Sequence, residues 1–132
     1  MLNLKKLLTQ IINKLNTLTT LKTLSISRVI STTYMTDTQF NRIKAYKKNG
    51  MLFLLFNAEF TNAGLSASSN FVAIGKISGW NAITSVVVSV PCQMDASKVA
   101  TINVTANGSV EIYSKTLITS WFRTFVCVPC SS

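Results

Sequence analysis

The stretch RIKAYKKNGMLFLLF (residues 42–56) decides the fold of this chain. The dipeptide Asn49-Gly50 at its centre accepts positive φ at both central positions of a type I′ turn, so it predicts a β-hairpin. Before the turn, Ile43, Ala45 and Lys47 fall on one face of a strand. After the turn, residues 51–56 are apolar on both faces and the apolar pattern continues through Ala58 and Phe60, which is typical of a strand at the centre of a sheet or at a subunit interface.

Similar strand patterns continue on both sides of this hairpin. Residues 24–31, 71–77, 80–90 and 120–129 favour strands, and ATINVTANGSVEIYS (residues 100–114) predicts a second hairpin that turns at Asn107-Gly108. About seven strands at regular spacing, with no second helical stretch, predict a mainly β domain over residues 23–132. Its expected architecture is an antiparallel β-sandwich of the jelly-roll kind.

The N-terminal residues have a helical pattern instead. Apolar residues recur in steps of four and three, which predicts a helix over residues 2–20 with one apolar seam: Leu4, Leu8, Ile11, Leu15 and Leu18. Leu7 and Ile12 widen the seam, which indicates contact with more than one other helix or with another surface. Because an isolated helix of this length is marginal in water, residues 1–22 are expected to trimerise as a coiled coil or to anchor the chain.

The same N-terminal stretch is interpreted neither as a membrane span nor as a signal peptide. No segment reaches the ~18–20 apolar residues that a span requires. Polar residues interrupt the apolar run of residues 2–18, and no small-residue cleavage site follows it.

Catalytic chemistry has few candidates in this composition. The chain contains no histidine, which removes the commonest general base, and only four acidic residues: Asp37, Glu59, Asp95 and Glu111. These carboxyl groups are widely spaced, and the five glycines do not form a phosphate-binding loop. The chain is therefore predicted not to be an enzyme.

Three cysteines, Cys92, Cys127 and Cys130, complete the reactive residues. An odd number argues against a disulfide framework and favours folding in a reducing cytoplasm. Cys127 and Cys130 have the CxxC spacing of redox and zinc sites, but the motif ends the chain and a fourth zinc ligand is missing. Small buried or edge thiols are the favoured interpretation, with no metal and no cofactor.

The charge balance is strongly basic, with 13 lysines and arginines against four acids and a net charge of +9. Such an excess attracts anionic partners, among them nucleic acid, phosphate-rich cell-wall polymers and acidic proteins. A surface-binding site is predicted at the basic hairpin and at a nearby aromatic residue: Lys44, Tyr46, Lys47, Lys48 and Trp80. A nucleic-acid-binding finger has this composition, but a solvated hairpin end is favoured because no nucleic-acid-binding motif accompanies it.

The order of these features resembles the small C-terminal domains of bacteriophage fibre, head-fibre and baseplate receptor-binding proteins. The resemblance rests on the Lys48-Asn49-Gly50 hairpin leading into the apolar strand 51–60, the hairpin from Ile102 to Ile112, the terminal aromatic strand and the leading helix LNLKKLLTQIINKL. It departs from the family at Ile77-Ser78-Gly79-Trp80, where members often carry a proline-glycine segment.

The resemblance implies a homotrimer on a virion that is assembled in the bacterial cytoplasm. The helix would contact other virion proteins or trimerise, and the β domain would be a knob for attachment to the host surface, with an anionic glycopolymer as the expected ligand class. The alternatives are a capsid-decorating or minor structural virion protein without a receptor role, a small basic nucleic-acid-binding protein, and a carbohydrate-acting enzyme.

Overall fold

A computed structural model describes residues 3–19, 21–82, 84–92, 95–119 and 121–131. For residues 17–19, 81–82 and 131 it describes the backbone alone. The elements in chain order are α1 (Leu4–Thr19), β1 (Lys22–Arg28), α2 (Asp37–Phe40), β2 (Lys44–Lys48), β3 (Met51–Glu59), β4 (Val72–Ser78), β5 (Asn81–Ala82), β6 (Val86–Pro91), β7 (Val99–Val104), β8 (Ser109–Ser114) and β9 (Trp121–Ser131).

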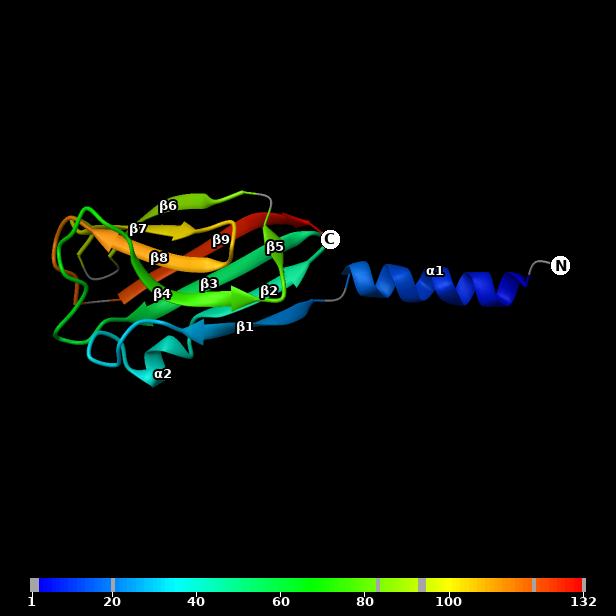
Figure 1. The fold of residues 1–132 in the computed structure, drawn as a ribbon, viewed down its shortest axis with the longest axis horizontal. Coiled ribbons are helices and arrows are strands. Elements are labelled where there is room, and N and C mark those ends of the chain that lie inside the picture. The colour runs from blue at the N-terminus through cyan, green and yellow to red at the C-terminus, as the bar shows by residue number, and fades with distance from the viewer. Residues whose placement is uncertain (1–2, 20, 83, 93–94, 120, 132) are drawn as a thin grey trace.

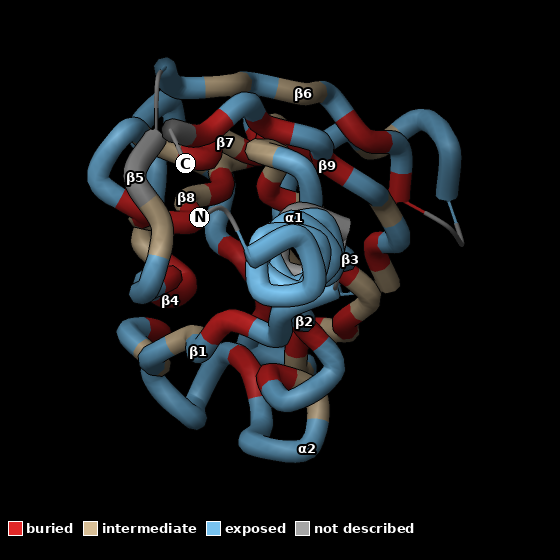
Figure 2. Tube along the Cα trace, turned by 90° about the vertical axis from the view of Figure 1, so that its right-hand side faces the viewer, coloured by how far each residue is buried: buried red, intermediate tan, exposed pale blue. Residues whose placement is uncertain are grey.

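The described strands form one antiparallel sheet in the order β5-β9-β3-β2-β1-β4-β8-β7-β6. The sheet curls until β6 comes close to β9, so the body is a nearly closed barrel to which β5 adds a short strand (Figures 1 and 2). The mainly β, antiparallel prediction is confirmed. The two-sheet sandwich is not confirmed, because the pairing is continuous around the barrel.

Strand β1 makes this continuity possible. Its first half pairs with β2, from Lys22 to Leu24, and its second half pairs with β4, from Ser25 to Arg28. Gly75 of β4 lies so close to β1 that an added Cβ would be 2.8 Å from the Ser27 carbonyl oxygen. The register of β4 also shifts between Ala73 and Gly75. A bulge of this kind bends a strand, so the sheet turns a corner here without separating into two layers.

Both predicted hairpins are present, but their turns differ. Asn49 has a φ of 53° and Gly50 has a φ of 72°, as the type I′ turn between β2 and β3 requires. At the second turn only Gly108 has a positive φ, of 89°. There the Thr105 carbonyl accepts a hydrogen bond from the Gly108 amide, and the Thr105 amide donates to the Ser109 carbonyl. This hairpin is therefore closed by a longer loop that contains a single left-handed glycine.

The core fills the inside of the barrel, where alternate residues of each strand point. Strand β3 buries Leu52, Leu54, Phe56 and Ala58 and lies between β9 and β2, which confirms its predicted central position. The opposite face of β3 is apolar in its first half, at Met51, Phe53 and Leu55, and these residues remain at the surface. The largest fully buried side chains come from several strands and connections: Phe56, Phe122, Met35, Leu52, Leu54, Ile74, Ile77, Ile102, Ile112 and Ile118.

Two segments differ from the sequence prediction. The connection between β1 and β2, where no second helical stretch was predicted, contains the single-turn helix α2, and the Thr36 side chain caps it by accepting a hydrogen bond from the Gln39 amide. Residues 80–90, predicted to be one strand, divide into β5, which pairs with the end of β9, and β6, which pairs with β7.

The predicted N-terminal helix is confirmed as α1, which extends away from one end of the barrel (Figure 1). Asn3 caps it, since the Asn3 side chain accepts a hydrogen bond from the Lys6 amide at 3.1 Å. No helix in the described ranges is long and apolar enough to cross a membrane.

Candidate functional site

The apolar seam of α1 is the first candidate site. Its described side chains, those of Leu4, Leu8, Ile11 and Leu15, are all exposed, and Ile11 retains 48% of its accessible surface. The side chain of Leu18 lies outside the described residues. Viewed along the helix, α1 is exposed around its circumference (Figure 2). The barrel therefore does not cover the described part of the seam.

The predicted basic site divides between the two faces of β2. Lys44, Tyr46 and Lys48 alternate on the outer face of the barrel, whereas Lys47 pairs with Lys22 of β1 and lies on the opposite side of the strand. The hairpin thus brings together three of the five predicted residues. A run of adjacent lysines in a strand cannot form a single patch, because successive side chains point to opposite faces.

Trp80, the fifth predicted residue, lies in the connection between β4 and β5. Its ring is half-buried and packs against the barrel core. A Cβ added to Gly108 would lie 3.0 Å from the indole nitrogen of Trp80, so the β7–β8 turn is close to it. Trp80 thus packs beside the second hairpin, on an element separate from the basic face of β2.

A second aromatic and basic cluster lies on the outer face of β9 and was not predicted from the sequence. The guanidinium groups of Arg42 and Arg123 lie 4.6 and 5.8 Å from the ring centroid of Trp121. Arg123 also donates a hydrogen bond to the Asn57 side chain at 3.1 Å. The Arg42–Trp121 contact joins residues far apart in the sequence, whereas Arg123 and Trp121 lie on the same face of β9, and their alternation along that strand was the only sequence signal.

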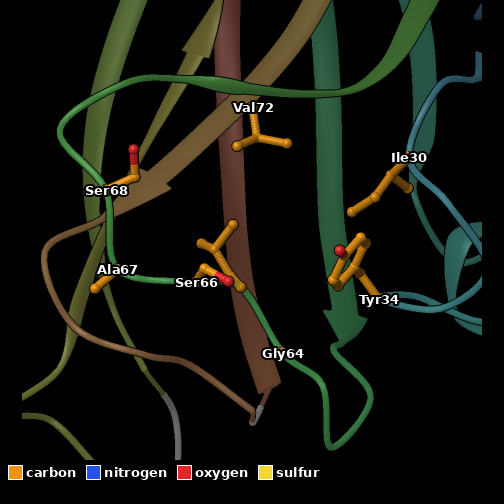
Figure 3. Close-up of a pocket in the computed structure, with 8 residues that line it drawn as sticks. Ile30, Tyr34, Gly64, Ser66, Ala67, Ser68 and Val72 are labelled. Atoms are coloured by element: carbon orange, nitrogen blue, oxygen red, sulfur yellow. The ribbon is translucent and has the colours of Figure 1, made fainter.

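The barrel end opposite α1 contains a pocket with a volume of about 410 Å³. Tyr34 and Ile30 lie on one side of it, and Ala67 and Ser68 lie on the other (Figure 3). The complete lining, which we call the distal pocket, is Ile30, Tyr34, Gly64, Leu65, Ser66, Ala67, Ser68 and Val72. An exposed tyrosine ring and serine hydroxyls around an apolar floor can accept a small amphipathic ligand group.

Backbone hydrogen bonds hold the walls of the distal pocket. The Leu65 and Ile118 backbones exchange two hydrogen bonds, of 2.8 and 3.0 Å, and the Thr61 amide donates to the Tyr34 carbonyl at 2.8 Å. Gly64 has a φ of +67°, and a Cβ added there would lie 2.6 Å from the Ile118 carbonyl oxygen. Only glycine therefore fits at the point where the pocket loop passes residue 118.

The Arg28 side chain fixes the loop that carries Tyr34. Its Nε donates to the Ile30 carbonyl at 2.7 Å, one terminal nitrogen forms a 2.9 Å ion pair with Asp37, and the other donates to the Met35 carbonyl. Its guanidinium group also lies 5.3 Å from the Phe40 ring centroid. One arginine thus satisfies backbone acceptors on both sides of Tyr34, which positions this wall of the distal pocket.

The CxxC cysteines do not meet. They lie on β9, where Cys127 is exposed and Cys130 is buried, and all three cysteines are free thiols. Three residues along a strand is an odd step, so the two side chains point to opposite faces. Within the described residues no three potential metal ligands come together.

Among the acidic residues, Asp95 has a perturbed environment. The Ser97 hydroxyl and the Ser97 amide both donate hydrogen bonds to its carboxylate, and these bonds hold the pKa of Asp95 below its ordinary value. Both partners belong to the same exposed loop, so the arrangement stabilises the turn before β7.

Comparison of the sequence with models of protein families and with curated proteins gave no match.

Proposed function

We propose that this chain is a non-enzymatic phage fibre or receptor-binding protein of the virion, which trimerises through α1 and carries the barrel as a knob for attachment to the host surface. The observation that carries the proposal is α1 itself. It projects from the barrel with an apolar seam that its own chain leaves exposed. A helix of 16 residues is near the lower limit of stability in water, so it needs a partner.

The width of the seam favours three chains or a binding surface over a simple pair. Leu7 and Ile12, which lie beside the seam, are exposed as well. An a/d seam alone suits two helices, whereas additional apolar residues at its flanks are buried when more helices surround it. The same surface could instead pack against another virion protein, in which case α1 would anchor the chain to the virion.

The opposite end of the molecule is the proposed attachment site. The distal pocket lies at the barrel end away from α1, where a virion-anchored helix would leave it accessible. The net charge of +9 favours an anionic glycopolymer as the host ligand. We further propose that the barrel is distantly related to jelly-roll knobs. The strands on the β2 side of β1 would then correspond to one sheet of the sandwich, and the strands on the β4 side to the other.

Two measurements test the proposal. Antibody-gold labelling in electron microscopy is expected to find the chain on purified particles of the phage that encodes it, and a fluorescent full-length chain is expected to bind the host cells of that phage. Ala67→Trp, which fills the distal pocket, should abolish cell binding. Val87→Trp, which places the same ring on the exposed face of β6, should leave cell binding unchanged.

The competing functions give different results. A chain that is present on particles but does not bind cells would support a capsid-decorating role and contradict receptor binding. A chain absent from particles that binds DNA or RNA with a steep salt dependence would support a nucleic-acid-binding function and contradict the virion role.

A further inference from the structure

The outer face of the barrel carries an apolar patch on β3 and β9. Strand pairing places Phe53 opposite Cys127 and Leu55 opposite Phe125, and the rings of Phe53 and Phe125 stack with centroids 5.7 Å apart. Leu55 retains 40% and Phe125 retains 55% of their accessible surface. We call this set the outer patch, and its members are Met51, Phe53, Leu55, Phe125 and Cys127.

The outer patch begins at the barrel end that carries α1. Met51 follows the β2–β3 turn, and β2 pairs with the first residues of β1, directly after the helix (Figure 1). Only residues 20 and 21 separate α1 from β1. Because each residue spans at most about 3.6 Å, two residues keep each barrel within about 11 Å of its helix. Chains joined through α1 therefore hold their barrels side by side at a high effective concentration.

We propose that the outer patch packs against a second copy of this chain, so that neighbouring barrels contact each other through β3 and β9. This inference rests on the proposed self-association through α1. Stable interfaces have an apolar, uncharged centre with polar residues at the rim. The outer patch follows this pattern, since none of its members is charged and Lys44 lies beside it on β2. Arg123, the next outward residue along β9, is already engaged by Asn57 and Trp121.

The rival occupant of this face is single-stranded nucleic acid. Exposed aromatic rings beside lysines are typical of such sites, and Tyr46 and Lys44 lie next to Phe53 and Leu55. The aliphatic and sulfur-containing members of the patch, Met51, Leu55 and Cys127, offer no ring for base stacking. Contact with a second copy would bury all five members, which is why it is the occupant we propose.

Cys127 provides a direct readout of this contact. It is exposed in the single chain and belongs to the outer patch, whereas Cys92 and Cys130 are buried in the barrel. The experiment treats native full-length protein with iodoacetamide, locates the modified cysteine by peptide mass spectrometry and measures the mass of the same sample by light scattering. In wild type we expect an oligomer in which Cys127 is alkylated at least about tenfold more slowly than in the dissociated Ile11→Asp chain.

Two substitutions at exposed strand positions separate the outer patch from general surface effects. Phe125→Thr should restore rapid alkylation of Cys127, and Val87→Thr, at a similarly exposed position on β6, should not change it. Thr is a good strand former, so both variants are expected to fold. Alkylation of Cys92 and Cys130 should remain slow in every folded variant, which checks that the barrel is intact.

The alkylation rate of Cys127 and the mass of the wild-type protein together distinguish loss of the barrel contact from loss of association through α1. An oligomeric wild type in which Cys127 reacts as fast as in Ile11→Asp would overturn the barrel contact and leave association through α1 intact. A monomeric wild type would contradict the proposed self-association and the barrel contact together. If Cys127 reacts rapidly and only added oligothymidylate protects it, the outer patch is a nucleic-acid surface and the barrel contact is wrong.

Discussion

Substitution of Ile11 by aspartate is expected to dissociate the assembly. Ile11 lies at the centre of the α1 seam and retains 48% of its accessible surface in the single chain. About half of the ~1.5–3 kcal/mol gained by complete burial of an isoleucine side chain is therefore still available for association, roughly 1 kcal/mol per chain. The new carboxylate adds a desolvation penalty of several kcal/mol per chain (order of magnitude) when it is enclosed without a partner.

For three chains these effects sum to more than about 10 kcal/mol, and since about 1.4 kcal/mol corresponds to a factor of ten, association should weaken by more than about a millionfold. Sedimentation velocity of the full-length variant should show the 14.5 kDa single chain. Far-UV circular dichroism should show loss of the α1 helix signal with retention of the strand signal, because the helix is marginal alone.

Asn13→Asp is the matched control, because it introduces the same charge about 200° around the helix from Ile11. It is expected to sediment like wild type. If Ile11→Asp also sediments like wild type, the seam is not an oligomer contact and the reasoning from its exposure is wrong.

Three further predictions concern the barrel. Phe122→Ala removes a fully buried ring and should lower the free energy of unfolding by about 3–5 kcal/mol in urea titrations, and a loss below about 1 kcal/mol would contradict its place in the core. Gly64→Ala should destabilise the barrel by about 1–3 kcal/mol, because the new Cβ would meet the Ile118 carbonyl at a positive φ, and an unchanged melting temperature would refute that contact. Ser97→Ala removes the hydroxyl hydrogen bond to the Asp95 carboxylate and should raise the Asp95 pKa toward its ordinary value in a carboxyl ¹³C NMR titration. In wild type this bond stabilises the loop at pH values above the unfolded-state pKa of Asp95, and the stabilisation is lost as pH falls through the folded-state pKa. An Asp95 titration that is the same in both proteins would contradict the role of this hydrogen bond.

Local patterns were sufficient to predict α1 and both hairpins, but not α2 or the division of residues 80–90 into β5 and β6. Asn49-Gly50 predicted the first hairpin because only a few residue types tolerate two positive φ values, and the seven-residue spacing predicted α1 because it is visible within a single helix. The alternation along residues 120–129 predicted a strand, and in β9 it separates the buried Phe122 from the exposed Arg123. These are properties of neighbouring residues, which a sequence displays directly.

Closure of the barrel and the distal pocket depended on non-local contacts. Nothing in residues 22–28 indicates that β1 changes partner halfway, from β2 to β4, since that depends on the close approach of Gly75. The distal pocket combines residues 30 and 34 with residues 64–68 and 72, and the Arg42–Trp121 contact joins the segment before β2 to the first residue of β9. The basic residues within 44–48 were grouped into one binding site because they are adjacent in the sequence. In a strand, adjacent side chains point to opposite faces, so Lys47 is separated from the others.

The mass of the unmodified full-length chain in dilute solution, measured by native mass spectrometry, decides whether α1 is an assembly device. We predict a complex of three times the 14.5 kDa chain mass, which persists at micromolar concentration. A single chain at the same concentration, with α1 still helical by circular dichroism, would contradict both the trimer and the argument that this helix requires a partner.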